Sequence, residues 1–573
     1  MQIKKLDISN YRNLHNQKVS FADDCNFIVG ENNLGKSNLL YILQILFANR
    51  AFNNSDFTDV ANPIQVILQL KLEDIEIGHF EDLFDTAGYH LINITCTQLT
   101  PDDNIEFYHS ETNTFIQPSI VRCINFVYYD SLRNPISEIN FDKGKGVGRF
   151  LSNMIDKYLE EKSLSDTDFI NEEKVNELLT SINSKISKLK TFNDFKIQAS
   201  SESEVESLLS KIVVLKDDKG EPLSKSGYGV QFLILITLSI LERIQYIKEQ
   251  RREKGIFEHE TDHTKHISLI LGLDEPEIHL HPYMQRSLIK YLNNIISNKN
   301  IEFQKLVKEL FDIDGFNGQI IVATHSPNII LNDFTQIIRL YPKDNITKIK
   351  SGSEILLDEK QSKRLHMHFP SIKEAFFSRC VIFVEGDSEE SSFIHFSEKM
   401  AIDLDELGIS VIQSRGGEVA AIKLLMELVG KFDIPSAGIG DKDNNTPVTA
   451  PLYLTTKKDF EDELVALIDV GRETFLEDLV KDFEGADAVV QSGSLNKYAV
   501  KAFRITTTEF TTGLKLSEIP KTDITNLKAF YLTWLSGKKS YPLGKLIGES
   551  ILEADIPVIY KTVISKAAEL SKK

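Results

Sequence analysis

The chain has 573 residues, 42% of them hydrophobic and 26% charged, so it can bury more than one core, and about two to four domains are expected. Its 65 basic and 84 acidic residues give a formal net charge of −19. This balance excludes a strongly basic nucleic-acid-binding protein, but not a DNA enzyme that carries local basic patches.

The amino terminus, MQIKKLDISNYRN, has no signal-peptide core, and the chain shows no apolar run of membrane-spanning length. Its four cysteines have no CxxC spacing, which argues against a zinc knuckle or a disulfide scaffold. We therefore expect a cytoplasmic protein that does not contact a membrane.

Residues 1–150 begin with short β-rich segments. The patterns at 3–9 and 26–30 predict strands, and the apolar spacing of 37–50 predicts a helix. Between the second strand and this helix lies GENNLGKS, the context that a phosphate-binding loop requires. Two alternating segments, 64–72 and 89–99, predict strands of a half-exposed sheet.

In this loop, backbone N–H groups would cradle phosphates at a helix N-terminus. Lys36 would reach the β- and γ-phosphates of ATP, and the Ser37 hydroxyl would bind Mg²⁺. The predicted nucleotide-binding residues of the loop are Gly30, Asn32, Asn33, Gly35, Lys36 and Ser37.

Residues 151–212 are polar and helical in period, which predicts a helical insertion, either a lobe or a dimerisation arm. The segment SKSGYGVQ follows, with Ser226, Gly227 and Gly229 before an apolar helix. In ABC-type ATPases such a signature caps the γ-phosphate held by a partner chain. The alternative is a simple turn before a core helix.

Two buried strands then end in polar residues. ISLILGL leads to Asp274 and Glu275, where the first can hold Mg²⁺ and the second can polarise the attacking water. IIVATH ends at His325, which would face the γ-phosphate. The order of these motifs predicts an ABC-type ATPase head over 1–150 and 213–365, interrupted by the insertion.

A second α/β unit is predicted over 376–573, with strand–helix–strand rhythm and a helical extension. VIFVEGDSE would place Glu385 and Glu389 on one helical face, and IGDKD would point Asp441 and Asp443 the same way. Four carboxylates at one sheet edge need cations, and Mg²⁺ or Mn²⁺ suits oxygen ligands. The alternative is that these acids only cap helices.

EGxxE followed by DxD is the Toprim signature, and DEPEIHLHP and ATHSP resemble the SMC/RecF branch of ABC ATPases. Nearly the whole chain resembles the OLD (overcoming lysogenization defect) nucleases, a group that includes the Gabija-type nucleases. The fold class implied is α/β, an ABC-type ATPase head with a helical insertion followed by a Toprim domain with a Rossmann-like parallel sheet.

The resemblance implies a metal-dependent DNA endonuclease or exonuclease with two-metal hydrolysis, often serving antiphage defence, with the ATPase as sensor or gate. We expect a homodimer or a dimer of dimers. The resemblance makes Glu461 in KKDFEDEL an additional metal ligand, with Asp459 and Glu463 as alternatives. It also makes Lys539 in GKKSYPLGK the catalytic lysine, ahead of Lys538 and Lys545. The catalytic residues expected overall are Glu275, His325, Glu385, Asp441, Asp443 and Lys539.

Three points stay open at this level. An operon partner would be a helicase-like protein, or a retron with its RNA/DNA and reverse transcriptase. A non-nucleolytic repair or sensing ATPase with a Toprim-like binding platform is the main alternative. RNA instead of DNA as substrate is the other, because the hydrolysis chemistry is similar.

Overall fold

The structure is a computed structural model. It describes residues 1–48, 50–80, 90–131, 138, 146–162, 172–188, 197–201, 213–217, 219–250, 255–278, 280–344, 346–415, 419–442, 448–502 and 509–572. The chain divides into two compact units, Met1–Glu354 and Ile355–Lys573.

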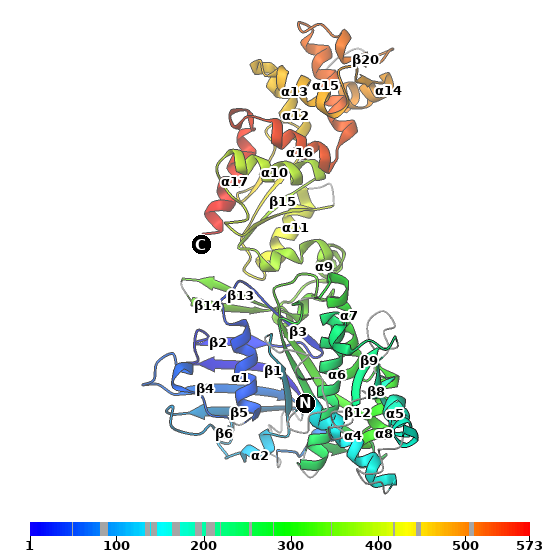
Figure 1. Ribbon diagram of the computed structural model, residues 1–573. Helices are drawn as coiled ribbons and strands as arrows, with labels where there is room; N and C mark the ends of the chain where they lie inside the picture. The colour runs from blue at the N-terminus through cyan, green and yellow to red at the C-terminus, as the bar shows by residue number, and fades with distance from the viewer. Residues whose placement is uncertain are drawn as a thin grey trace. The chain divides into compact units, whose positions relative to one another are not determined.

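Unit 1 contains two main sheets (Figure 1). The first is antiparallel, in the order β2-β1-β4-β5-β6, with β1 Gln2–Ser9, β2 Gln17–Ser20, β4 Ile64–Lys71, β5 Leu91–Gln98 and β6 Glu106–His109. The second runs β10-β11-β12-β3-β13-β14, with β7 also paired to β11. Its strands are β3 Cys25–Val29, β7 Asn125–Tyr129, β10 Ile256–Glu258, β11 Lys265–Asp274, β12 Gly315–Ala323, β13 Ile337–Lys343 and β14 Ile346–Ser351.

The two sheets differ in burial, as their sequences predict. In β4, buried and exposed side chains alternate, which is the pattern of a sheet with one solvated face. In β11 the last eight residues are all buried, because the parallel core strands are covered on both faces. Strands β11, β12, β3 and β13 pair in parallel. Their carboxyl ends, with Asp274 on β11, His325 after β12 and the glycine-rich loop after β3, therefore meet at one sheet edge.

The helices of unit 1 are α1 Lys36–Ala48, α2 Pro118–Val121, α4 Gly146–Lys162, α5 Glu172–Ile186, α6 Tyr228–Gln250, α7 Pro282–Ile296 and α8 Ile301–Phe311. In Figure 1, the antiparallel sheet and helices α4 to α8 lie on opposite sides of β3 and β12. By length and composition, Tyr228–Glu249 of α6 could cross a membrane, although no such run was predicted. Two thirds of it (67%) is buried inside the structure, as in a core helix.

The insertion differs from the sequence-based expectation. It is not wholly helical, since β8 Ile197–Ser201 pairs with β9 Val213–Asp217. Lys188 within it pairs with Glu309 of α8, so this part of the insertion packs on its own unit. Two further segments have structure that no motif predicted. Strand β14 and helix α9 Glu359–Ile372 lie near the boundary of the two predicted domains, and the edge strand β10 precedes β11.

Unit 2 is built on a four-stranded parallel sheet in the order β16-β15-β17-β18. The strands are β15 Cys380–Val384, β16 Ile409–Gln413, β17 Ser436–Gly440 and β18 Leu452–Leu454, and a small pair is formed by β19 Val489–Val490 and β20 Leu514–Lys515. Besides α9, the helices are α10 Asp387–Lys399, α11 Val419–Gly430, α12 Phe460–Val465, α13 Glu473–Phe483, α14 Ser492–Leu495, α15 Ile524–Lys538, α16 Tyr541–Ser550 and α17 Val558–Leu570.

Alternation along β15 gives each face of this sheet its own helices. Cys380, Ile382 and Val384 belong to a core that also contains Phe393 of α10 and Tyr560 of α17. Helix α11 covers the other face closely, and a Cβ at Gly438 of β17 would lie 2.7 Å from an α11 side chain. With both faces covered, the carboxyl ends of β15 and β17 form an open edge, where α/β sheets bind ligands.

Candidate functional site

The glycine-rich loop of unit 1 lies between β3 and α1. Gly30 has a φ of +142°, and a Cβ there would lie 2.2 Å from the carbonyl oxygen of Leu340. Gly35 has a φ of +96°, and its Cβ would lie 2.6 Å from a neighbouring side-chain oxygen. Both positions require glycine. Asn32 and Asn33 form the turn between them, and Asn33 is left-handed at φ 62°.

The side chain of Lys36 folds back over this loop. Its Nζ donates to the carbonyl oxygens of Gly30 (2.9 Å) and Glu31 (2.7 Å). Burial lowers the pKa of Lys36 to about 8, although the nearby Glu275 and Asp274 act to raise it. A phosphate would give this ammonium a stronger, charge-assisted partner than two carbonyl groups. The loop therefore fits a nucleotide phosphate.

The two groups predicted to hold Mg²⁺ beside the nucleotide are in contact. Ser37 Oγ donates to Asp274 Oδ1 over 3.0 Å, and Tyr128 OH donates to Asp274 Oδ2 over 3.1 Å. Burial raises the pKa of Asp274 and also that of Tyr128, whose hydroxyl therefore remains a donor. No sequence motif predicts a role for Tyr128. It contacts Asp274 because its strand, β7, pairs with β11.

Glu275 and His325 face each other beyond the ends of β11 and β12, with Nε2 of His325 3.3 Å from Oε1 of Glu275. Burial, followed by the charge of Lys36, lowers the pKa of His325 and keeps its imidazole neutral at pH 7. Glu277 Oε1 fixes the backbone by accepting from the N–H of His325 (2.6 Å) and from Thr324 Oγ1 (2.7 Å). The glutamate predicted to polarise water thus has an oriented neighbour.

The signature segment lies just before α6. The helix begins at Tyr228, so Ser226 precedes it by two residues. The carbonyl oxygen of Ser226 accepts from Gln231 Nε2 over 2.7 Å. Gly227 has open space where a Cβ would lie, and Gly229 sits in the first turn. The segment therefore lies at the positive end of a long helix dipole.

In unit 2, Glu385 and Asp441 meet at the open edge of the parallel sheet. Glu385 follows β15, and Asp441 follows the adjacent β17. The backbone N–H of Asp441 donates to Oε2 of Glu385 over 3.0 Å. Asp443 lies outside the described residues, so its predicted pairing with Asp441 is not placed.

Glu389 is turned towards the backbone between strand and helix. Its Oε2 accepts from the N–H groups of Glu385 (3.0 Å) and Gly386 (3.1 Å). Its Oε1 accepts from Tyr560 OH over 3.1 Å. The predicted shared helical face of Glu385 and Glu389 is wrong, because α10 begins only at Asp387. Glu389 instead closes the start of α10, which matches the alternative capping role.

Lys539 reaches the same edge from between α15 and α16. Its Nζ lies 2.6 Å from Oε2 of Glu461, a buried side chain, although half of the lysine side chain is exposed (50%). The other two candidate lysines pair elsewhere. Lys538 lies 3.1 Å from Glu484, and Lys545 pairs with a glutamate of its own helix at 3.7 Å. Among the candidates, the geometry singles out Lys539.

The alternatives to Glu461 are engaged by local backbone. Asp459 caps α12 by accepting from the N–H of Asp462 over 2.9 Å. Glu463 Oε1 accepts from Thr456 Oγ1 (2.6 Å) and from the N–H of Lys457 (2.8 Å). Of the three candidate acids, Glu461 is the one that pairs with Lys539 and lines the cavity.

Burial and repulsion from neighbouring carboxylates raise the pKa values of three carboxyl groups at this edge, those of Asp441, Glu389 and Asp459. Burial, then Glu389 and Glu385, raise the pKa of Asp441 to about 9. Burial raises the pKa of Glu389 and of Asp459 to about 7 each. Burial acts to lower the pKa of Lys539, but the surrounding carboxylates outweigh it and the net shift is upward. Without a metal ion, the positive charge around these carboxyl groups is too small to keep them all ionised. A divalent cation would supply the missing charge.

The carboxylates open into a cavity of about 290 Å³, whose walls include Glu385, Glu389, Gln413, Asp441, Glu461 and Lys539. Their hard oxygen donors fit Mg²⁺ or Mn²⁺. Within the described part of the chain, no group of three or more His, Cys, Asp or Glu is already arranged around one metal position. Binding would therefore require these side chains to exchange hydrogen bonds for metal.

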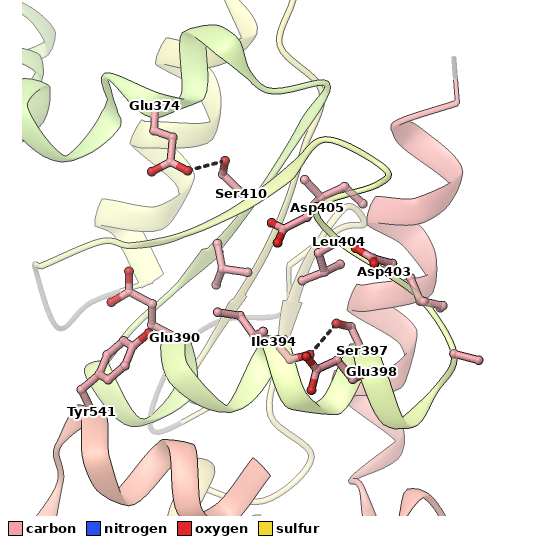
Figure 2. A pocket seen from close by; sticks show the side chains of 14 residues that line it. Glu374, Glu390, Ile394, Ser397, Glu398, Asp403, Leu404, Asp405, Ser410 and Tyr541 are labelled. Atoms are coloured by element: carbon pink, nitrogen blue, oxygen red, sulfur yellow. Dashed lines mark hydrogen bonds between the residues drawn. The ribbon is translucent and has the colours of Figure 1, made fainter. Parts of the chain in front are cut away.

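A larger cavity of about 620 Å³ lies on the same unit (Figure 2). Carboxylates surround apolar Ile394 and Leu404, and Glu374 accepts from Ser410 Oγ over 3.1 Å. Its other acids include Glu390, Glu398, Asp403 and Asp405. None of the predicted site residues lines it, so size alone does not mark the functional cavity.

Together, the two units define an ATPase head followed by a Toprim-type parallel sheet. The model of the AAA ATPase domain family matches residues 1–141 and 128–330, and the model described as overcoming lysogenization defect protein-like, TOPRIM domain matches residues 376–443. The chain therefore belongs to the AAA ATPase domain family and carries an OLD-like TOPRIM domain after it.

Three curated relatives are similar to this chain. Endonuclease GajA of Bacillus cereus (strain HuB5-5) is 24% identical over 245 residues, which is 39% of this chain and 31% of that protein. Endonuclease GajA of Bacillus cereus (strain VD045) is 22% identical over 435 residues, 69% of this chain and 67% of that protein. The OLD nuclease of Thermus scotoductus (strain ATCC 700910 / SA-01) is 26% identical over 196 residues, 33% of each protein. The match spans about a third of the first and third relatives and about two thirds of the second.

Proposed function

We propose that this protein is an ATP-controlled DNA endonuclease whose phosphodiester hydrolysis depends on Mg²⁺ or Mn²⁺. The observation that carries the proposal is the convergence of Glu385, Asp441 and the Lys539–Glu461 pair on one cavity. Acidic residues that only cap helices would not need a lysine from another element. The names of the relatives, endonuclease and OLD nuclease, support the same activity.

In the proposed reaction, Glu385, Asp441 and Glu461 provide carboxylate oxygens for the cations, together with Asp443. Glu389 serves chiefly by holding the backbone of Glu385 in place. Bound divalent ions would supply Lewis-acid stabilisation of the scissile phosphate. The ammonium of Lys539 is placed to neutralise the charge that develops on the phosphate.

DNA as the substrate is consistent with lysines that lie close to Asp441 and Glu461 in the chain, despite the net charge of −19. Lys442 directly follows Asp441, and its Nζ donates to the Thr456 carbonyl oxygen over 3.3 Å. Thr455 Oγ1 accepts from the backbone N–H of Lys442 (2.9 Å) and contacts the carbonyl oxygens of Lys457 (3.0 Å) and Lys458 (3.2 Å), so the backbones of three lysines lie close together. Such local charge can contact phosphates even on an acidic protein.

ATP would be bound by the glycine-rich loop with Lys36, while Ser37 and Asp274 would hold its Mg²⁺. Glu275, oriented beside His325, would polarise the attacking water. The segment at Ser226 would close the site of a second copy, so the active ATPase is a homodimer or a dimer of dimers. A glycine-containing helix N-terminus suits that role because its backbone can approach phosphate closely.

The wider setting is also a proposal. We place the protein in the cytoplasm, in keeping with four buried cysteines and no disulfide among the described residues. An antiphage role, which the resemblance to the OLD and Gabija-type nucleases implies, is part of the proposal. An operon partner, either helicase-like or a retron with its reverse transcriptase, belongs to the same proposal. A non-nucleolytic sensing ATPase is the competing function.

Incubation of the purified protein with supercoiled plasmid tests the proposal. We expect nicked or linear product with Mg²⁺ or Mn²⁺, none with EDTA, and a change in rate when ATP is added. A parallel reaction with single-stranded and structured RNA decides the substrate. Uncut plasmid under every metal and nucleotide condition, with ATPase activity intact, would favour the sensing ATPase.

A further inference from the structure

Lys539 lies on a short connection that is tied to the helix carrying Glu389. Ser540, the residue after it, lies between α15 and α16. The backbone N–H of Ser540 donates to Ser388 Oγ over 3.1 Å. The Ser388 hydroxyl in turn donates to the carbonyl oxygen of Ser540 over 3.3 Å. One buried hydroxyl therefore fixes both backbone groups of the residue next to the lysine.

The following helix, α16, lies unusually close to α10. Ser392 Oγ donates to the carbonyl oxygen of Gly544 over 2.8 Å. A Cβ at Gly544 would lie 2.1 Å from the Ser388 carbonyl oxygen, and one at Gly548 would lie 2.6 Å from His395 Cβ. Only glycine permits this approach, because the first of these contacts is with backbone that cannot move aside cheaply.

Helix α10 thus connects both sides of the cavity. It begins at Asp387, two residues after Glu385, and Ser388 and Glu389 are adjacent in its first turn. The same turn that orients the Glu385 backbone through Glu389 also orients the lysine connection through Ser388. Lysine has a long, flexible side chain, so its charge is placed accurately only if its backbone is held.

We propose that Ser388 and Gly544 are positioning residues that hold Lys539 over the carboxylates of the cavity. The inference rests on the proposed nuclease function for its catalytic consequence, but the placement of the lysine is a separate claim. Ser388 lines the cavity, but its hydroxyl is engaged by the backbone of Ser540, and Gly544 lies on α16. Both act by fixing the connection from which Lys539 reaches Glu461.

The first test measures placement without activity. The full-length protein is acetylated briefly with an amine-reactive ester, and mass spectrometry gives the labelling of Lys539 relative to Lys538. We expect the relative labelling to rise several-fold in Ser388→Ala and Gly544→Ala, because the ion pair is loosened. Gly537→Ala is the matched control, since a Cβ there meets no atom within 4 Å. An unchanged ratio in both variants would overturn the proposal.

The second test is a double-mutant cycle in plasmid cleavage. We expect Ser388→Ala to lower kcat by about ten-fold or more, because a misplaced catalytic group can cost about 100-fold. In the Lys539→Ala background the same change should cost nothing further. If the losses instead multiply, Ser388 acts through general packing and the proposal is wrong. Ser388→Ala keeps the test usable should Gly544→Ala fail to fold.

The two claims fail separately. Wild-type protein that cuts no plasmid contradicts the nuclease function, while the labelling ratio still decides the placement of Lys539. Wild-type protein that cuts plasmid, with labelling unaffected by both variants, contradicts only the positioning role.

Discussion

The backbone N–H of Asp441 donates a 3.0 Å hydrogen bond to Oε2 of Glu385, linking the ends of two neighbouring parallel strands. These residues are 56 positions apart in sequence. The bond holds the Glu385 carboxylate next to the backbone of Asp441, and both side chains line the cavity. Their like charges are close enough to favour a cation strongly.

The raised pKa of Asp441 predicts a pH-dependent stability. With a pKa of about 9 in the folded protein and about 3.9 in the unfolded chain, Asp441 binds an extra proton in the folded state between these values. Without metal, the contribution of Asp441 to the free energy of unfolding therefore falls as the pH rises between these two values. We expect the Tm of Asp441→Asn minus that of wild type to grow from pH 5 to pH 9. A Tm difference that stays flat or shrinks over this range would contradict the raised pKa of Asp441. Added Mg²⁺ should make the Tm difference smaller.

Nucleotide binding should depend on Lys36. Lys36→Ala removes the ammonium that two loop carbonyls hold in place, so binding of a fluorescent ATP analogue should fall by about 100-fold or more, as expected for a lost charge-assisted contact of about 3 kcal/mol. Lys18→Ala is the control, because its side chain is 81% exposed on β2. Equal affinity in both variants would place the nucleotide elsewhere.

Glu275→Gln should separate ATP binding from hydrolysis. The amide keeps the shape of the side chain beside His325 but cannot polarise water as a carboxylate does. We expect turnover to fall by about 100-fold or more, within the range of general-base losses, while ATP stays bound. Light scattering should then show a larger assembly with ATP than without. Mass that is independent of ATP would count against nucleotide-driven pairing through the Ser226 segment.

Tyr560→Phe should destabilise the protein by about 1–3 kcal/mol, because a buried acceptor loses its donor. The hydroxyl of Tyr560 donates to Glu389 Oε1, and the tyrosine is fully buried. Tyr11→Phe is the matched control: Tyr11 is equally buried, and its hydroxyl has no hydrogen-bond partner in the described structure. Chemical unfolding of the full chain measures both. Equal effects of the two substitutions would mean that the hydrogen bond from Tyr560 to Glu389 adds nothing to the free energy of unfolding.

The sequence predicts those parts of the fold that have a strong local pattern. The buried strand before Asp274 and the glycine-rich loop before Lys36 are local, and the structure has both elements where they were expected. Pairing Glu385 with Asp441 could be anticipated because parallel strands end at one edge. The role of Glu389 could be anticipated only as the alternative of helix capping, because it depends on where α10 starts, and helix starts are uncertain by a few residues.

Other contacts have no sequence signal at all. Tyr560 lies 171 residues from Glu389 and sits in an ordinary apolar helix. Ser388 meets Ser540 across 152 residues, through the packing of α16 on α10. Tyr128 reaches Asp274 only because β7 pairs with β11. Such partners are set by tertiary packing, which neither periodicity nor motif spacing encodes.

Cleavage by Asp441→Asn tests the central claim most directly. The variant keeps the backbone N–H that bonds Glu385, but replaces the carboxylate that would bind metal. Asp405→Asn is the control, an acidic residue of the larger cavity in the same unit. Supercoiled plasmid is incubated with each protein, Mg²⁺ or Mn²⁺, and ATP. The account predicts loss of cleavage by at least about 1,000-fold in Asp441→Asn, the scale of several kcal/mol of transition-state stabilisation, with ATPase activity intact and Asp405→Asn active. Wild-type cleavage rates in Asp441→Asn would contradict it.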